Sequence, residues 1–301
     1  LVDRLPLDGH QVVVIDNFAT GRRENLAAAG DAIRLVEGDV RDPAAVADAV
    51  GGCEVVFHQA ALAAVARSID DPAEVTDVNV GGTLNVLLQA RDAGTRRVVF
   101  ASSSSIYGDT PTLPKVESMP PRPRSPYAAT KVAGEAYLQA FDASFGLEGV
   151  SLRYFNVYGP RQSPRSRYAA VVPLFLEAMS QGRSPTIYGD GEQTRDFSFV
   201  GDVVDAVVRA ASAPGARGQV MNAGGGGRRV SILELASIIA REVGWEGEPV
   251  HEAPRAGDVR HSLADVTRAE TLLGWHPSTT LEEGIRRLAA SRAHSPGGAA
   301  R

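Results

Sequence analysis

Short apolar runs alternate with longer helical patterns through the first half of this 301-residue chain, and this alternation constrains the fold more than any other feature. The runs are rich in β-branched residues, which is typical of strands buried on both faces of a parallel sheet. They cover residues 12–15, 33–37, 55–58, 98–102 and 149–154, and helical patterns cover 44–50, 75–93 and 127–145. Strand, helix and strand at this spacing predict the α/β class, with a doubly wound parallel sheet and right-handed crossovers.

The sequence pattern changes after Asn156, where loops rich in Pro, Arg and Gly surround two helical segments. These are residues 171–181 and 231–243, and Ser231 with Glu234 forms a capping-box pattern at the start of the second. Residues 195–213 and 220–223 are expected to return to the sheet. We therefore expect a sheet domain of residues 1–155 plus 196–225, a smaller lobe of 156–195 plus 226–293, and a disordered tail at 294–301.

Charge and cysteine content exclude several classes of function. The net charge of −5 leaves no basic excess of the kind that binds nucleic acid or acidic membranes. Cys53 is the single cysteine, so we expect no disulfide framework and no metal site. No apolar run approaches the roughly 18 residues of a membrane span, and the first residues do not resemble a secretory leader. We expect a cytoplasmic protein without nucleic-acid or membrane partners.

Asp16 ends the first predicted strand, where dinucleotide-binding folds place a carboxylate that accepts hydrogen bonds from the adenosine ribose. A turn or cap role is an equal alternative for this residue taken alone. A carboxylate here repels a 2′-phosphate, which favours NAD over NADP even though Arg22 and Arg23 are near in sequence.

Asp39 and the pair Ala60–Ala61 follow later predicted strands at their carboxyl ends. Open α/β sheets bind ligands there, and small residues let the backbone approach a cofactor. His58, just before the two alanines, is more typical of a packed strand residue than of a catalytic base.

The stretches ASSSSIYG and SPYAATK carry the strongest chemical signal. Pro126 suits a helix start, so Tyr127 and Lys131 share a helical face to which the strand ending at Ser103 can present a hydroxyl. Tyrosine is a poor base at neutral pH unless a cation stabilises its phenolate. Tyr127 could then remove a hydroxyl proton as a hydride leaves the same carbon, with Ser103 relaying that proton. The alternative, a solvated lysine on an amphipathic helix, is disfavoured because only two of the 31 basic residues are lysine.

These motifs make the chain resemble the extended short-chain dehydrogenase/reductase family, and within it the NAD-dependent sugar-nucleotide epimerases related to UDP-glucose 4-epimerase. Matching stretches run from end to end. They are VVVIDNFATGRRENL, EGDVRD, FHQAAL, VNVGGTLNVL, ASSSSIYGD, SPYAATK, LRYFNVYGPRQ, YAAVVPLF, IYGDGEQTRDF and AGDVRHSLAD. The resemblance implies a Rossmann sheet with a smaller C-terminal substrate lobe.

The resemblance also implies three groups of site residues. The implied catalytic trio is Ser103, Tyr127 and Lys131. The implied NAD contacts are Asp16, Asn17, Thr20, Gly21, Asp39, Val40, Ala60, Ala61, Asn79, Tyr127, Lys131 and Tyr154. The implied contacts to a UDP-sugar are Ser103, Ser105, Asn156, Val172, Tyr188, Arg195, Asp258, Arg260 and Ser262.

The chemistry of these residues agrees with the resemblance. Arginines offer paired donors to a pyrophosphate, and Tyr188 can stack on a uracil ring. Taken alone, Arg195 and Arg260 could equally be surface charges or ion-pair partners of Asp196 and Asp258. The implied reaction oxidises the sugar C4, rotates the 4-keto sugar and returns the hydride to its other face. A small residue at Ser262 leaves room for an N-acetyl group at C2.

Family members begin with a strand and a G-x-x-G-x-x-G turn, which this sequence lacks. That loop supplies N–H groups to the cofactor pyrophosphate, so we expect the sheet to lack its first strand and the chain as written not to turn over. Pro6 would also interrupt the helix expected at the start. We expect the sequence to be either a fragment of a complete enzyme, which the missing initial Met favours, or a non-catalytic NAD-binding protein, which is an alternative function.

Other enzymes of the same fold are further alternatives. A 4,6-dehydratase would carry an acidic pair where this chain has Ser104 and Ser105, and decarboxylation or epimerisation of UDP-glucuronate is also possible. The resemblance implies a homodimer, for which the helices at 75–93 and 127–145 are the candidate interface, although their apolar stripes could be ordinary core contacts.

Overall fold

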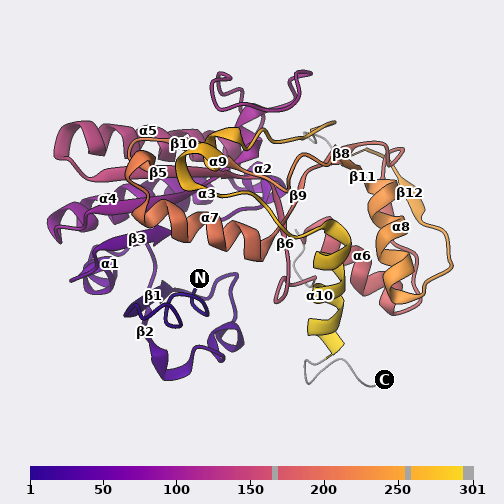
Figure 1. The fold of residues 1–301 in the computed structure, drawn as a ribbon, viewed down its shortest axis with the longest axis horizontal. Helices are drawn as coiled ribbons and strands as arrows, with labels where there is room; N and C mark the ends of the chain where they lie inside the picture. The colour runs from indigo at the N-terminus through magenta and orange to yellow at the C-terminus, as the bar shows by residue number, and fades with distance from the viewer. Residues whose placement is uncertain (165–168, 255–258, 294–301) are drawn as a thin grey trace. The chain divides into compact units, whose positions relative to one another are not determined.

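In a computed structural model of the chain, four parallel strands form one sheet in the order β10-β5-β4-β3 (Figure 1). These strands are β3 (Val55–His58), β4 (Arg97–Ser103), β5 (Glu148–Tyr154) and β10 (Val220–Ala223). The structure describes every residue except 165–168, 255–258 and 294–301, so the expected tail lies outside the described residues. The predicted α/β class with a Rossmann-type parallel sheet is confirmed.

Two compact units make up the chain. The first comprises Leu1–Ile106, Ser125–Arg153 and Val207–Val220, and the second comprises Tyr107–Arg124, Tyr154–Ala206 and Met221–Arg301. The second unit thus includes residues 107–124 and 196–206, which the sequence assigned to the sheet domain. The expected functional domains stay a prediction.

Strand β1 (Val12–Asp16) pairs in parallel with β2 (Ile33–Glu37), with Val12 opposite Ile33 and Asp16 opposite Glu37. These two strands form their own small sheet, and every residue of β1 is only partly buried. Before β1, residues 1–9 form hydrogen-bonded turns rather than the expected helix. Pro6 explains the difference, because it has no N–H to donate to a preceding carbonyl.

Helix α5 (Pro126–Phe145) has clear sequence signals at both ends. The Ser125 hydroxyl accepts a hydrogen bond from the Ala128 N–H at 3.2 Å, and Gly146 ends the helix in a left-handed conformation with φ of 73°. Apolar residues of α5 and of α4 (Gly82–Asp92) bury Phe100 of β4 in a shared core. Helix α1 (Pro43–Val50) packs against α4 in a second cluster around Val46.

The segment expected as one helix at 75–93 is divided into three parts. It comprises α3 (Pro72–Thr76), a π-helical turn at Asp77–Gly81, and α4. π-helical turns are rare and are frequent at functional sites. This turn carries Asn79, whose side chain is 3% exposed.

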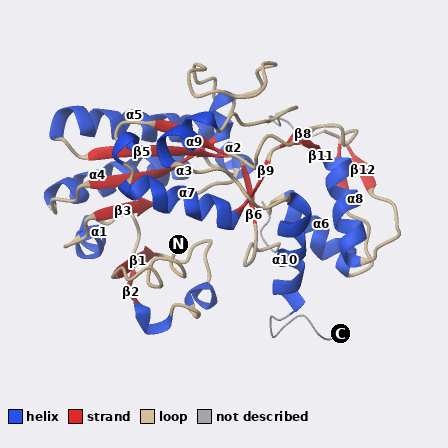
Figure 2. Ribbon diagram, in the orientation of Figure 1, coloured by secondary structure: helices blue, strands red, loops and turns tan. Residues whose placement is uncertain are grey.

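The second unit builds its core from α6 (Val171–Ser180), α8 (Ile232–Val243) and α10 (Leu281–Ala293) (Figure 2). The predicted cap of α8 is present, because the Ser231 hydroxyl accepts from the Glu234 N–H at 3.0 Å. Three short strand pairs complete this unit, namely β6 (Asn156–Tyr158) with β9 (Phe197–Phe199), β8 (Thr194–Arg195) with β11 (Val230–Ser231), and β7 (Thr186–Tyr188) with β12 (Val250–Glu252).

Three remaining helices are α2 (Val65–Asp70), α7 (Val200–Ser212) and α9 (Thr267–Leu273). Helix α7 runs from the second unit into the first. Among the described residues, no helix combines the length and the apolar character needed to cross a membrane.

Candidate active site

Ser103, Tyr127 and Lys131 lie together in the first unit, as the sequence predicts. Ser103 is the last residue of β4, and the two other side chains lie one helical turn apart at the start of α5. The Ser103 hydroxyl lies beside the Tyr127 phenol. Tyr127 and Lys131 are 8% and 3% exposed, and Ser103 is partly buried.

The Lys131 ammonium is held by main chain rather than by an adjacent carboxylate. Its Nζ donates to the Ala101 carbonyl oxygen at 2.6 Å and lies 4.8 Å from the centroid of the Phe100 ring. Burial lowers the pKa of Lys131 to about 8, and the charge of Glu135 partly opposes this shift. The other lysine, Lys115 in the second unit, is 2% exposed and is also enclosed.

Ser105 sets the direction of the Ser103 hydroxyl. The Ser105 N–H and Oγ donate to the Ser103 oxygen at 3.2 and 2.9 Å. A hydroxyl has one proton and two acceptor positions, so these two bonds leave the Ser103 proton available to a further acceptor. Ser105, expected as a substrate contact, is thus bonded to Ser103, the predicted catalytic serine.

Burial raises the pKa of Tyr127, and the hydrogen bond from Ser103 opposes this shift. The phenol is therefore protonated at neutral pH in the unliganded protein. To act as a base it needs additional positive charge close by, which Lys131 and an oxidised nicotinamide would both supply.

A buried ion pair lies behind the trio and was not singled out in the sequence. Glu135 follows Lys131 by one helical turn and accepts from Arg153 Nε at 2.9 Å and Nη2 at 2.7 Å. Its carboxylate also accepts from the Ser102 hydroxyl at 2.5 Å. The i, i+4, i+8 spacing of Tyr127, Lys131 and Glu135 on α5 is the signal that could have identified it.

Asp16 and Asp39, two predicted cofactor residues, adopt well-defined local geometry. Asp16 Oδ1 accepts from the Phe18 N–H at 2.7 Å, and a Cβ placed at Gly21 would lie 3.2 Å from Asp16 Oδ2. Asn17 donates to Asp39 at 2.9 Å. The Arg41 guanidinium bonds to the Asp39 carboxylate and holds its pKa well below the usual range.

The other predicted cofactor residues differ in exposure. Ala60 and Thr20 are exposed and Ala61 is partly exposed, which leaves room for a ligand. Val40 is buried, and its carbonyl accepts from Asn85. Tyr154, at the end of β5, belongs to the second unit. A carboxylate for ribose hydroxyls beside small exposed residues fits NAD.

The predicted substrate residues of the second unit lie on several of its short elements. Asn156 begins β6 and is exposed, whereas Tyr188 ends β7 and is partly buried. Val172 is 1% exposed and its side chain packs in the hydrophobic core, so its place among the substrate contacts stays a prediction. Ser262 is 8% exposed, and Asp258 lies outside the described residues.

Arg195 and Arg260 are connected within this unit. Arg195 Nη1 donates to the carbonyls of Thr194 at 3.0 Å and Arg260 at 3.4 Å. The Arg260 guanidinium bonds to both carboxylate oxygens of Asp190, at 2.9 and 2.7 Å. Both Arg260 and Asp190 are about half exposed, so an anionic ligand could displace the pair at little cost.

Asp196, which follows Arg195 in the sequence, is a buried carboxylate that holds two loops together. It is fully buried and accepts from the N–H groups of Gly225 at 2.6 Å and Ala264 at 2.9 Å, rather than pairing with an arginine. Burial raises the pKa of Asp196 to about 6. The carboxylate thereby joins the loop after β10 to the segment that carries Arg260.

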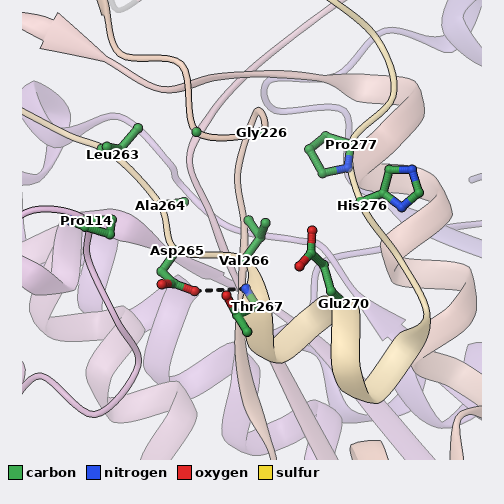
Figure 3. A pocket seen from close by; sticks show the side chains of 11 residues that line it. Pro114, Gly226, Leu263, Ala264, Asp265, Val266, Thr267, Glu270, His276 and Pro277 are labelled. Atoms are coloured by element: carbon green, nitrogen blue, oxygen red, sulfur yellow. Dashed lines mark hydrogen bonds between the residues drawn. The ribbon is translucent and has the colours of Figure 1, made fainter.

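A pocket of about 500 Å³ also lies in the second unit, beside the start of α9 (Figure 3). Just before this helix the Asp265 carboxylate accepts from the Thr267 N–H at 2.9 Å, and His276 and Glu270 contribute to the wall. None of the residues predicted for catalysis, cofactor or substrate lines it.

The sheet is parallel, its strand β4 ends in a serine, and a buried tyrosine and lysine lie next to that serine one helical turn apart. These features define an NAD-dependent enzyme of the short-chain dehydrogenase/reductase type. The family model "NAD dependent epimerase/dehydratase family" matches residues 1–224, and the chain belongs to this family.

Individual relatives cover nearly the whole chain. A UDP-glucose 4-epimerase from Mycolicibacterium smegmatis is 47% identical over 293 residues, 95% of this chain and 91% of the relative. The UDP-glucose 4-epimerase of Thermotoga maritima, solved with UDP-glucose, gives a TM-score of 0.93 at 36% identity and covers 97% of this chain and 94% of its own. The UDP-N-acetylglucosamine 4-epimerase of Methanobrevibacter ruminantium M1, solved with UDP-N-acetylmuramic acid, gives 0.91 at 34% identity, covering 97% and 95%.

Proposed function

We propose that this protein is an NAD-dependent 4-epimerase of a UDP-sugar, with UDP-glucose or UDP-N-acetylglucosamine as substrate. The observation that carries the proposal is the trio, in which the Ser103 hydroxyl lies beside a buried phenol one helical turn from an enclosed ammonium. The epimerases that are similar over nearly the whole chain support the choice of reaction.

The side chains of the trio divide the proton chemistry among them. Tyr127 removes the proton of the C4 hydroxyl, and Lys131 stabilises the phenolate that acts as base. Ser103, whose proton is not used by Ser105, donates to the reacting oxygen beside the phenol and holds it in line. Bound NAD would supply the reversible hydride acceptor for C4. Returning the proton from Tyr127 after the 4-keto sugar has rotated gives the inverted alcohol with no net redox change.

Arg195 and Arg260 are proposed to bind the UDP pyrophosphate. Their guanidinium groups offer paired donors to phosphate oxygens. When phosphate oxygens replace the Asp190 carboxylate as the partner of Arg260, the positive charge of Arg260 still has a negative partner. Tyr188 is proposed to stack on the uracil ring. The small side chain of Ser262 is the proposed reason that a C2 N-acetyl group can be accepted.

Elimination of water is the competing reaction of this fold. It needs an acidic pair after the catalytic hydroxyl, and this chain has Ser104 and Ser105 at the start of a 3-10 turn there. The Ser105 hydroxyl is already bonded to Ser103, and a serine hydroxyl is not the acid that elimination of water needs. Epimerisation is therefore favoured over dehydration.

We propose a cytoplasmic homodimer formed through α4 and α5. Most apolar residues of these helices pack inside the first unit, but Phe145 at the end of α5 is 54% exposed. Light scattering coupled to gel filtration should give twice the chain mass, and Phe145→Glu should shift the population towards the monomer.

The test of function is product identity. Residues 1–301, and a version extended at the N-terminus by a strand and a glycine-rich loop, are incubated with NAD and either UDP-glucose or UDP-N-acetylglucosamine. We expect the 4-epimer by NMR, with no accumulation of NADH. A 4-keto-6-deoxy sugar would instead identify a dehydratase, release of carbon dioxide from UDP-glucuronate would identify a decarboxylase, and NAD binding without any product would favour a non-catalytic role.

A further inference from the structure

A chain of hydrogen bonds lies beneath the trio and is almost completely shielded from solvent. It joins His58 at the end of β3, Thr83 in α4, Asn79 in the π-helical turn and Thr130 in α5. These residues are 4%, 1%, 3% and 3% exposed, respectively. Buried polar groups that satisfy one another in this way hold a unique geometry.

The two threonines fix the direction of every bond in the chain, because each hydroxyl has a single proton. Thr83 donates to the Asn79 carbonyl oxygen at 2.6 Å, so it accepts from His58 Nε2 at 2.8 Å. Thr130 donates to the Tyr127 carbonyl oxygen at 2.7 Å, so it accepts from Asn79 Nδ2 at 3.1 Å. Each threonine hydroxyl therefore donates one hydrogen bond to a main-chain carbonyl and accepts one from a side chain. Only Thr130 donates to the carbonyl of Tyr127, the residue that carries the phenol.

Asn79 is the centre of this arrangement. Its Oδ1 accepts from the Leu62 N–H at 2.8 Å, and its Nδ2 donates to the Leu62 carbonyl at 3.2 Å as well as to Thr130. Both amide hydrogens of Asn79 are thus used within the protein. Leu62 directly follows Ala61, so one side chain joins the loop proposed to face NAD to the first turn of α5.

We propose that Thr130 is a positioning residue, whose hydroxyl, together with Asn79, sets the first turn of α5 and hence the Tyr127 phenol against the cofactor loop. The inference rests on the proposed function for its kinetic consequence. Thr130 acts through the Tyr127 main chain, because its hydroxyl is committed to Asn79 and to that carbonyl. Proton and hydride transfer are sensitive to displacements of the order of 1 Å, so loss of this connection should lower kcat.

The test compares Thr130→Val with Thr130→Ser, and with Thr83→Val as a matched control. Valine removes the hydroxyl at nearly constant volume, and serine keeps it. Thr130→Val should lower kcat about tenfold with KM for the UDP-sugar and Kd for NAD within about twofold, and Thr130→Ser should restore kcat. Thr83→Val should lower Tm similarly while leaving kcat near that of the parent. Parental kcat in Thr130→Val, or an equal loss of kcat in Thr83→Val, would overturn the proposal.

A second measurement does not depend on turnover. Tyrosine labelled with carbon-13 at Cζ, with the resonance assigned by Tyr127→Phe, reports the environment of the phenol in the NAD-bound protein. Thr130→Val should shift the Tyr127 resonance and its titration, whereas Thr83→Val should leave both unchanged. If the parent shows no epimerisation, the proposed function fails but this comparison still decides the positioning role. An unshifted resonance in Thr130→Val would refute it.

Discussion

Lys131 Nζ lies 5.8 Å from the centroid of the Tyr127 ring, on the same face of α5. This arrangement predicts that Tyr127→Phe lowers kcat by about 10²–10⁴-fold, because it removes the proton-transferring group and leaves the ring. NAD binding, measured by calorimetry, should change little. Tyr137→Phe on the same helix is the control and should keep parental turnover. Full activity in Tyr127→Phe would remove the basis of the proposed mechanism.

The buried pair of Glu135 and Arg153 predicts a large and non-additive loss of stability. Glu135→Leu or Arg153→Met alone should cost about 3–5 kcal/mol, since either removes one member of a buried ion pair whose residues are 5% and 4% exposed. The double variant should cost much less than the sum. Urea unfolding of the four proteins measures this cycle.

An exposed ion pair serves as the comparison for that cycle. Arg34 and Asp48 are 3.0 Å apart with side chains 48% and 61% exposed, so Asp48→Ala should cost less than about 1 kcal/mol. Strictly additive losses for Glu135 and Arg153 would show that they do not act as a pair.

Gly134 lies on α5 against Phe100, and a Cβ there would overlap the phenyl ring. Glycine to alanine inside a helix normally stabilises by about 1 kcal/mol, so the sign of the effect is diagnostic. We predict that Gly134→Ala lowers Tm, and that Phe100→Leu added to it recovers part of the loss. A rise in Tm for Gly134→Ala would mean that the ring moves away freely.

His58 predicts a pH dependence of stability. Burial, with a smaller contribution from Lys131, lowers its pKa from 6.5 to about 3 in the folded protein. Between these values the unfolded chain binds a proton that the folded chain does not, so stability falls as pH decreases, by up to about 1.4 kcal/mol per pH unit. His58→Gln keeps a donor for Thr83 but cannot titrate. Its unfolding free energy should decline less steeply between about pH 6.5 and pH 4, and parallel curves would contradict the assignment.

Local signals made α5 predictable from sequence to within one residue, because Ser125, Pro126 and Gly146 cap and start the helix through their own chemistry. The spacing of Tyr127 and Lys131 followed directly. The π-helical turn could not be predicted, since the apolar pattern of residues 75–93 is compatible with one regular helix and the turn depends on tertiary bonds of Asn79.

The short strands of the second unit were missed for a different reason. Asn156–Tyr158 and Phe197–Phe199 have three residues each and pair across about forty positions of sequence, so no local pattern identifies them. Val172 was assigned to the substrate site by family resemblance alone. Its side chain packs in the core because α6 has an apolar stripe that must be buried, and the resemblance carries no information on that direction.

The burial of both lysine side chains has a practical consequence for chemical labelling of this protein. Reagents that acylate amines find no accessible lysine on the folded chain, because Lys115 and Lys131 are 2% and 3% exposed. Unfolding releases both. The extent of lysine acylation therefore reports the fraction of unfolded molecules, and covalent attachment of the native enzyme to a solid support cannot rely on lysine side chains.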